Sequence, residues 1–136
     1  MLKKYALFFL LIFFALLYAI TMAQGLSWAY DSADSGDLLA AIATGGVPHP
    51  GGYPTYLFFA SLFAKIPLGE LAYRTNLFSM LSMLGAIVLA YRLVEKLTGN
   101  SNVATLSTLL FGSFPLVWSQ ALVTEVYASL TLLCLL

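Results

Sequence analysis

A run of residues without any charge, from Tyr5 to Ala23, most constrains what this chain can fold into. At ~1.5 Å per residue, a helix of this length crosses a hydrocarbon core of ~30 Å. Lys3 and Lys4 precede the run, and the positive-inside rule assigns them to the cytoplasmic side. Hydrophobic residues make up 61% of the chain and charged residues 9%, against roughly 25% charged in a soluble domain. The sequence therefore predicts an integral membrane protein.

The same run has a second interpretation as a cleaved secretory signal. Thr21 and Ala23 are small residues at suitable −3 and −1 positions. The apolar stretch, however, exceeds the ~7 to 15 residues usual for a signal, which favours a retained span. In either case the residues from Gln24 onward emerge on the extracytoplasmic side.

Further apolar segments predict an all-α, polytopic fold within one N-terminal membrane unit, residues 1–136. We expect membrane segments at about 5–23, 74–97 and 102–118, and an external loop at about 24–73. A polar turn joins the second and third segments, with Gly99 ending one helix and Ser101 or Asn102 capping the next. Pro115 is expected to kink or end the third. A last apolar run, 124–136, is shorter than a full span, so we expect an N-terminal piece of a larger protein.

Two short helices are expected inside the external loop. Asp34 is placed as the N-cap of the first, Asp37 lies in its first turn, and Gly45 and Gly46 end it. Residues 47–54 carry three prolines and two glycines, a composition that excludes regular structure. The stretch 54–64 is apolar and aromatic but too short to span, which predicts an interfacial or re-entrant helix.

This topology collects the ionisable side chains on the outer side, although they are far apart in sequence: Asp31, Asp34, Asp37, His49, Arg74 and Glu125. A charge at a helix centre costs roughly 2.5 to 3.5 kcal/mol, so such groups usually pair, face water or do chemistry. Structural roles remain open for five of them: a helix cap for Asp34, a first-turn carboxylate favoured by the helix dipole for Asp37, a backbone hydrogen bond for His49, a snorkelling anchor for Arg74 and a wet surface carboxylate for Glu125.

No motif identifies a metal or nucleic-acid site. One histidine with scattered carboxylates falls short of a zinc set, and a D-x-x-D pair alone does not identify magnesium or manganese. Six basic and six acidic residues give zero net charge, which provides no basic surface for nucleic acid. Cys134, in an apolar run, is typical of a small buried hydrophobic residue.

Four ordered motifs nevertheless resemble one family. They are DSGD (34–37) with HPGGYP (49–54), RTNLFS (74–79), WSQA (118–121) and TEVY (124–127). In this order and spacing they resemble the signature of the domain-of-unknown-function 2723 family, over residues 26 to 136. The family usually has Glu where this chain has Asp37, and Pro where it has Gly51.

The resemblance implies membership of the GT-C superfamily of polytopic glycosyltransferases, with a branch similar to protein O-mannosyltransferases. Such enzymes move a sugar, mannose in that branch, from a polyprenyl-phosphate carrier to a protein or glycan acceptor at the extracytoplasmic face of a plasma, inner or ER-type membrane. The catalytic carboxylate of the first external loop maps onto Asp34 or Asp37. No redox cofactor is implied, and the need for a divalent metal is left open.

The implied mechanism assigns a role to each remaining polar residue. Asp34 is the first choice to accept the proton of the attacking acceptor hydroxyl, with inversion at the anomeric carbon. Arg74, and less directly Lys65, would offset charge on the departing phosphate. His49, Tyr53 and Glu125 would contact the acceptor or sugar.

Two other classes of function remain compatible with the residues. In a transporter or channel subunit, 54–64 would be a re-entrant segment and the aspartates would bind a cation. In a small membrane-anchored interaction protein, the loop would be a connector, and Asp34→Asn would alter only stability.

Overall fold

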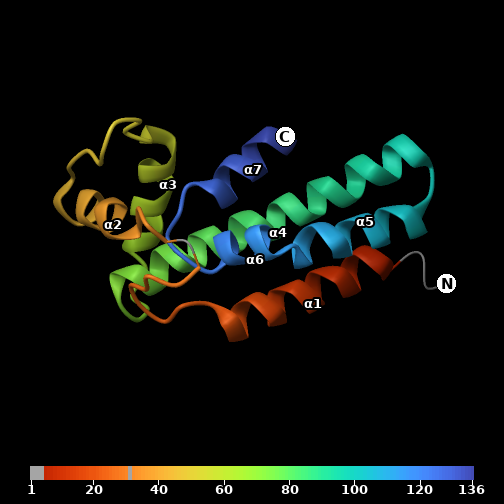
Figure 1. The fold of residues 1–136 in the computed structure, drawn as a ribbon, viewed down its shortest axis with the longest axis horizontal. Coiled ribbons are helices and arrows are strands. Elements are labelled where there is room, and N and C mark those ends of the chain that lie inside the picture. Colours follow the sequence, from red (N-terminus) through yellow and green to blue (C-terminus); the bar gives the residue numbers. More distant parts are fainter. Residues whose placement is uncertain (1–4, 31) are drawn as a thin grey trace.

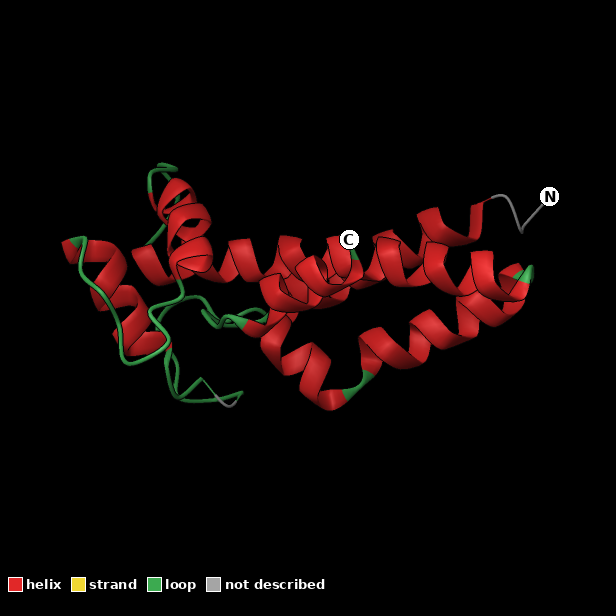
Figure 2. Cartoon of the chain, turned by 90° about the horizontal axis from the view of Figure 1, so that it is seen from above, coloured by secondary structure: helices red, strands yellow, loops and turns green. Residues whose placement is uncertain are grey.

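The computed structural model describes residues 5–30 and 32–136, and all regular structure in these ranges is helical (Figures 1 and 2). In chain order the helices are α1 (Ala6–Thr21), α2 (Ser35–Thr44), α3 (Pro54–Ala64), α4 (Leu71–Thr98), α5 (Ser101–Ser113), α6 (Pro115–Ala121) and α7 (Tyr127–Leu135). The predicted all-α class is confirmed for these residues. Lys3, Lys4 and Asp31 lie outside the described residues.

Helix α4 is the central element of the fold. Its 28 residues extend for ~42 Å, and it packs against α1, α3, α5, α6 and α7. Among the described helices it alone is long and apolar enough to cross a membrane by itself. Gly99 ends α4 with a left-handed φ of 64°, which confirms the predicted helix stop.

Helix α1 is part of the main core. Phe14 and Tyr18 have no exposed surface, and the Tyr18 hydroxyl donates a hydrogen bond of 2.8 Å to the carbonyl oxygen of Gly112. Gly112 allows this approach of α1 to α5, because a Cβ at that position would lie 2.5 Å from Cζ of Phe14. Helix α1 is therefore an integral part of the helical bundle.

The third apolar segment is broken into two helices, as its proline predicted. Helix α5 ends at Ser113 and α6 begins at Pro115, so Pro115 occupies the first turn of a new helix. The predicted cap of α5 at Ser101 or Asn102 was wrong. Asn100 is the N-cap, and its side-chain oxygen accepts from the backbone N–H of Asn102 at 2.9 Å. Because α4 ends at Gly99, Asn100 is the first extended residue available to start α5.

The two ends of the helical bundle differ in character (Figure 1). At one end lie the start of α1 and the α4–α5 turn, and at the other α2 and α3 gather around the start of α4. Figure 2 shows most of the loop segments at this second end. A small apolar core joins α2, α3, α4 and the start of α7 there: Leu38, Tyr56, Ala60, Phe78 and Val126. This core holds together the helices whose ends carry the polar residues of the external loop.

Candidate functional site

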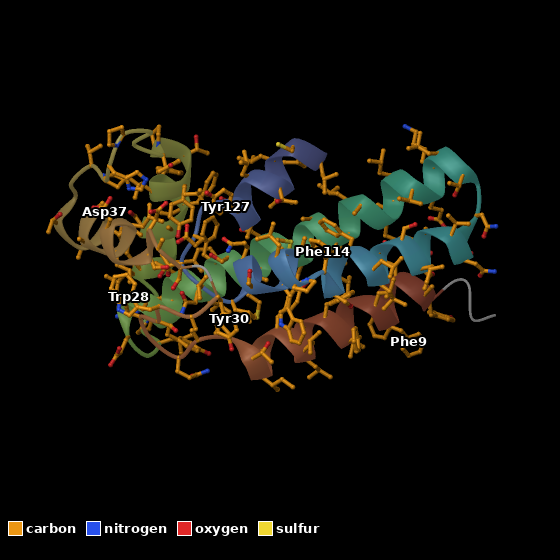
Figure 3. All side chains as sticks on the ribbon, viewed as in Figure 1. Phe9, Trp28, Tyr30, Asp37, Phe114 and Tyr127 are labelled. Carbon is orange, nitrogen blue, oxygen red and sulfur yellow. The ribbon has the colours of Figure 1, made fainter. Side chains whose placement is uncertain are left out.

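Helix α2 presents Asp34 and Asp37 at the loop-rich end of the bundle, where Figure 3 labels Asp37. Asp34 occupies the N-cap position and Gly45 ends the helix at a φ of 68°, as the sequence predicted. The Asp34 side chain, however, makes no capping hydrogen bond. Its Oδ2 instead lies 3.6 Å from Nε2 of His49, with 40% of the side chain exposed. The carboxylate is therefore directed to the loop rather than to its own helix.

His49 and Asp37 form a tight pair. Asp37 Oδ2 accepts from the backbone N–H of His49 at 2.8 Å and lies 2.7 Å from Nδ1 of the ring. The backbone N–H bond, together with the ring contact, lowers the pKa of the Asp37 carboxyl. The contact with Asp37, followed by the nearby charge of Asp34, raises the pKa of His49. His49 is thus better described as a bridge between two carboxylates than as a loop residue bonded only to backbone.

The loop that carries His49 has an unusual backbone. Gly51 has a φ of 121°, which the ring of proline forbids, so a proline cannot replace Gly51 in this conformation. Tyr53 has a φ of 42°, a left-handed conformation that costs a non-glycine residue about 1 to 3 kcal/mol. Its hydroxyl lies 3.4 Å from Nε2 of His49, and the two rings meet edge to face. This backbone places the Tyr53 hydroxyl beside the His49 ring.

Glu125 reaches the same place from the other end of the sequence. Its Oε1 accepts a hydrogen bond of 3.0 Å from the backbone N–H of Asp34, 91 positions away. The predicted convergence of Asp34 and Glu125 is therefore confirmed. Glu125 is only 2% exposed, so the wet-surface alternative does not apply. Burial raises the pKa of its carboxyl, while the Asp34 N–H acts in the opposite direction. We call Asp34, Asp37, His49, Tyr53 and Glu125 the His49 cluster.

The two predicted cations lie outside the His49 cluster. The Arg74 guanidinium donates to three backbone carbonyls of the α3–α4 connection, at Ala64, Gly69 and Glu70. Lys65 is exposed at the end of α3. In residues 5–30 and 32–136, no three His, Cys, Asp or Glu side chains are arranged to hold a metal ion.

Sequence reasoning missed a buried hydrogen-bonded group directly behind Glu125. Thr75, Asn76 and Thr124 are each no more than 2% exposed and contact one another through side-chain oxygens. Ser35 joins them, because its hydroxyl donates to the Thr124 carbonyl at 2.7 Å. The only sequence signal was that these residues lie within the DSGD, RTNLFS and TEVY motifs.

An apolar cavity of about 290 Å³ borders the His49 cluster between α3 and α7. Its lining residues include Tyr53, which belongs to the His49 cluster, and Val126, which follows Glu125 in the sequence. The remaining lining residues are Pro54, Thr55, Tyr56, Ser129, Leu130 and Leu133. A polar site and an apolar cavity therefore share a border, an arrangement suited to an amphiphilic ligand.

The described residues thus define an all-helical, largely apolar protein with a cluster of carboxylates and one histidine at one end. The chain belongs to the family described as the protein O-mannosyl-transferase TMEM260 N-terminal domain, whose model matches residues 34–136. The resemblance to an O-mannosyltransferase-like family is thereby confirmed, whereas assignment to the domain-of-unknown-function 2723 family stays a prediction.

Two curated relatives carry the same family name. A mouse protein named protein O-mannosyl-transferase TMEM260 is 32% identical over 84% of this chain and 16% of its own length. A Dictyostelium discoideum protein of that name is 29% identical over 83% of this chain and 14% of its own length. The chain therefore spans about one sixth of the length of these relatives. No solved structure matches it.

Proposed function

We propose that this chain is the N-terminal part of a membrane glycosyltransferase that moves mannose from a polyprenyl-phosphate carrier to a hydroxyl of a protein or glycan acceptor. The names of its relatives supply the transferase class. The observation that carries the proposal is the hydrogen bond between the Asp34 N–H and Glu125, because it joins distant motifs into one site.

Asp34 is the proposed general base. In Asp37, Oδ2 already accepts from the backbone N–H of His49 and contacts its ring, which leaves Oδ1 as the more available oxygen. Asp34 makes no capping bond and keeps 40% of its side chain exposed, so it can reach an acceptor hydroxyl. As the acceptor oxygen attacks the anomeric carbon, its proton passes to Asp34. The bond from that carbon to the phosphate oxygen breaks with inversion, and polyprenyl phosphate leaves with the electron pair.

His49, Tyr53 and the two cations are proposed to hold the sugar and phosphate. The Tyr53 hydroxyl lies 3.4 Å from Nε2 of His49, whose side chain is 35% exposed, and both groups can hydrogen-bond sugar hydroxyls. Lys65 is exposed, and Arg74 has three of its five N–H groups engaged, so both have donors left for phosphate oxygens. The apolar cavity beside Tyr53 suits the first isoprene units of the carrier.

We further propose a polytopic arrangement, with the N-terminus cytoplasmic and the His49 cluster at the extracytoplasmic face. Large apolar side chains on the outside of the bundle support this placement, since a surface of this kind suits lipid better than water. Examples lie on α1 and α5: Phe8, Leu16, Ile20, Leu106 and Leu110. In this arrangement, α3 rests on α4 at the outer boundary without crossing.

The test is a transfer assay on the purified complete protein with polyprenyl-phosphate mannose as donor. Asp34→Asn removes the proton acceptor at nearly constant shape, and we expect turnover to fall by about 10² to 10⁴-fold. Glu70→Gln is the matched control, because Glu70 is an exposed carboxylate outside the His49 cluster. Undiminished turnover in Asp34→Asn excludes Asp34 as the base, and absence of any mannose transfer by the wild-type protein contradicts the proposed function.

A further inference from the structure

We propose that Thr124 is a positioning residue for Asp34, acting through a buried network formed by Thr75, Asn76 and Thr124 (the Thr124 network). The inference rests on the proposed function of Asp34 as the base. No role was assigned to these three residues by the motifs in which they lie. Their contacts give them one, because they fix the segment to which the start of α2 is bonded.

Asn76 anchors the network to two other parts of the chain. Its Oδ1 accepts from the Thr124 hydroxyl at 2.7 Å, and its Nδ2 donates to the carbonyl of Ala23 at 2.9 Å, just after α1. Thr75 and Thr124 hydroxyl oxygens lie 2.5 Å apart. Because Thr124 gives its single proton to Asn76, the Thr75 proton is shared between the Thr124 oxygen and the carbonyl oxygens of Leu71 and Ala72, at 3.2 and 3.0 Å. The network therefore ties α4, the end of α1 and the α6–α7 connection together.

The network reaches Asp34 through two further bonds. The carbonyl of Thr124 accepts from the Ser35 hydroxyl, and the side chain of the next residue, Glu125, accepts from the Asp34 N–H. The donors of these two bonds are Asp34 and Ser35, the residues with which α2 starts, and Asp34 is the proposed base. Ser79 on α4 adds a bond of 3.5 Å to the Glu125 carbonyl. The position of the Asp34 backbone is thus set by residues of α4 and of the α6–α7 connection.

Burial makes this arrangement rigid. Thr124 is 1% exposed, so bulk water does not reach its hydroxyl to replace a lost partner. A displacement of about 1 Å in a catalytic group lowers turnover by about 10²-fold, so loss of this hydroxyl should lower kcat more than substrate affinity. A residue that served only stability would not separate kcat from KM in this way.

The experiment compares isosteric Thr→Val changes at two equally buried threonines in the complete protein. Thr124→Val removes the bonded hydroxyl, whereas Thr108→Val removes a buried hydroxyl on α5 that has no hydrogen-bond partner in the described structure. We expect Thr124→Val to lower kcat by about 10-fold or more with the donor KM within about 2-fold of wild type. Thr124→Ser, which keeps the hydroxyl, and Thr108→Val should retain wild-type kcat.

A second variant and a second readout keep the inference testable whatever the activity. Ser35→Ala removes only the bond to the Thr124 carbonyl and should lower kcat by about 3 to 10-fold at constant KM. In hydrogen exchange, amides of the first α2 turn should exchange faster in Ser35→Ala and Thr124→Val than in Thr108→Val. Wild-type kcat in both variants, or wild-type exchange of these amides in both, overturns the positioning role.

The two proposals can fail separately. Full turnover in Asp34→Asn contradicts the proposed base, and hydrogen exchange then decides whether Thr124 holds the α2 start. An inactive Asp34→Asn together with wild-type kcat in Thr124→Val and Ser35→Ala removes only the positioning role.

Discussion

At the scale of single residues, His49 connects the two aspartates of α2, and the charges of this pair depend on pH. The lowered pKa of Asp37 contributes stability above its ordinary value of 3.8, which is lost as pH falls through the folded value. The raised pKa of His49 contributes stability that is complete below its ordinary value of 6.5 and is lost as pH rises through the folded value. Both contributions are present together between these two ordinary values.

Replacing Asp37 should therefore change the titration of His49. In Asp37→Asn we expect the His49 pKa to fall toward 6.5, because the hydrogen bond to a charged partner is lost. The sequence has a single histidine, so imidazole NMR signals of the chain in detergent micelles report this residue alone. Glu70→Gln is the control for a general charge effect. An unchanged His49 midpoint in Asp37→Asn would show that the pair does not form.

Glu125 allows its charge to be separated from its hydrogen bond. Glu125→Gln keeps an oxygen for the Asp34 N–H and should change the free energy of unfolding by less than about 1 kcal/mol, whereas Glu125→Ala should cost about 1 to 3 kcal/mol. Because the folded pKa is raised, wild-type stability falls as pH rises above the ordinary 4.5. Glu125→Gln should lack that part of the decline. Thermal unfolding in detergent from pH 4.5 to 7 measures both effects, and equal pH slopes would contradict the raised pKa.

At the scale of helices, two glycines give opposite expectations for the same substitution. Gly112→Ala places a Cβ 2.5 Å from the Phe14 ring and should destabilise α1–α5 packing by about 1 to 3 kcal/mol. Gly36→Ala adds a methyl group to α2 where nothing lies within 4 Å, and should stabilise by about 0.5 to 1 kcal/mol. Thermal unfolding of the two variants provides the comparison. A neutral Gly112→Ala would mean that α1 does not pack against α5 this closely.

Helix boundaries show how far local sequence rules extend. Gly45, Gly99 and Pro115 acted as predicted, because glycine accepts the left-handed φ at which a helix ends, and proline fixes its own φ and lacks an N–H. The N-cap role of Asn100 was not predicted, because several consecutive polar residues there can each cap a helix. The residue at which α4 ends decides which of them caps α5. Asp34 was placed correctly at the start of α2, yet its side chain serves a tertiary contact instead of the cap.

At the scale of the whole molecule, the arrangement of the bundle predicts which residues face opposite sides of a membrane. In a Cys134→Ser background, we expect Gly36→Cys to be labelled by impermeant reagents from outside and Asn102→Cys from inside. These positions lie at opposite ends of the bundle, beside α2 and the α4–α5 turn (Figure 1). Labelling of both from the same side would contradict the proposed topology.

The site was only partly predictable from sequence for a reason that belongs to this scale. The predicted topology was enough to place Asp34 and Glu125 at one end, because counting apolar segments predicts which loops share a side. The Thr124 network could not be found in the same way, since Thr75, Asn76 and Thr124 carry no charge and have no helical or strand periodicity in common. Their role depends on how α4 packs against the α6–α7 connection.

The hydrogen bond from the Asp34 N–H to Glu125 also fixes when this end of the molecule can be completed during synthesis. A ribosome adding roughly 5 to 20 residues per second makes the later partner about 5 to 20 seconds after the earlier one. Until then the start of α2 has only water to bond, however early its own helix forms. Assembly of the His49 cluster consequently waits for Glu125, although the other four members, between Asp34 and Tyr53, are synthesised first.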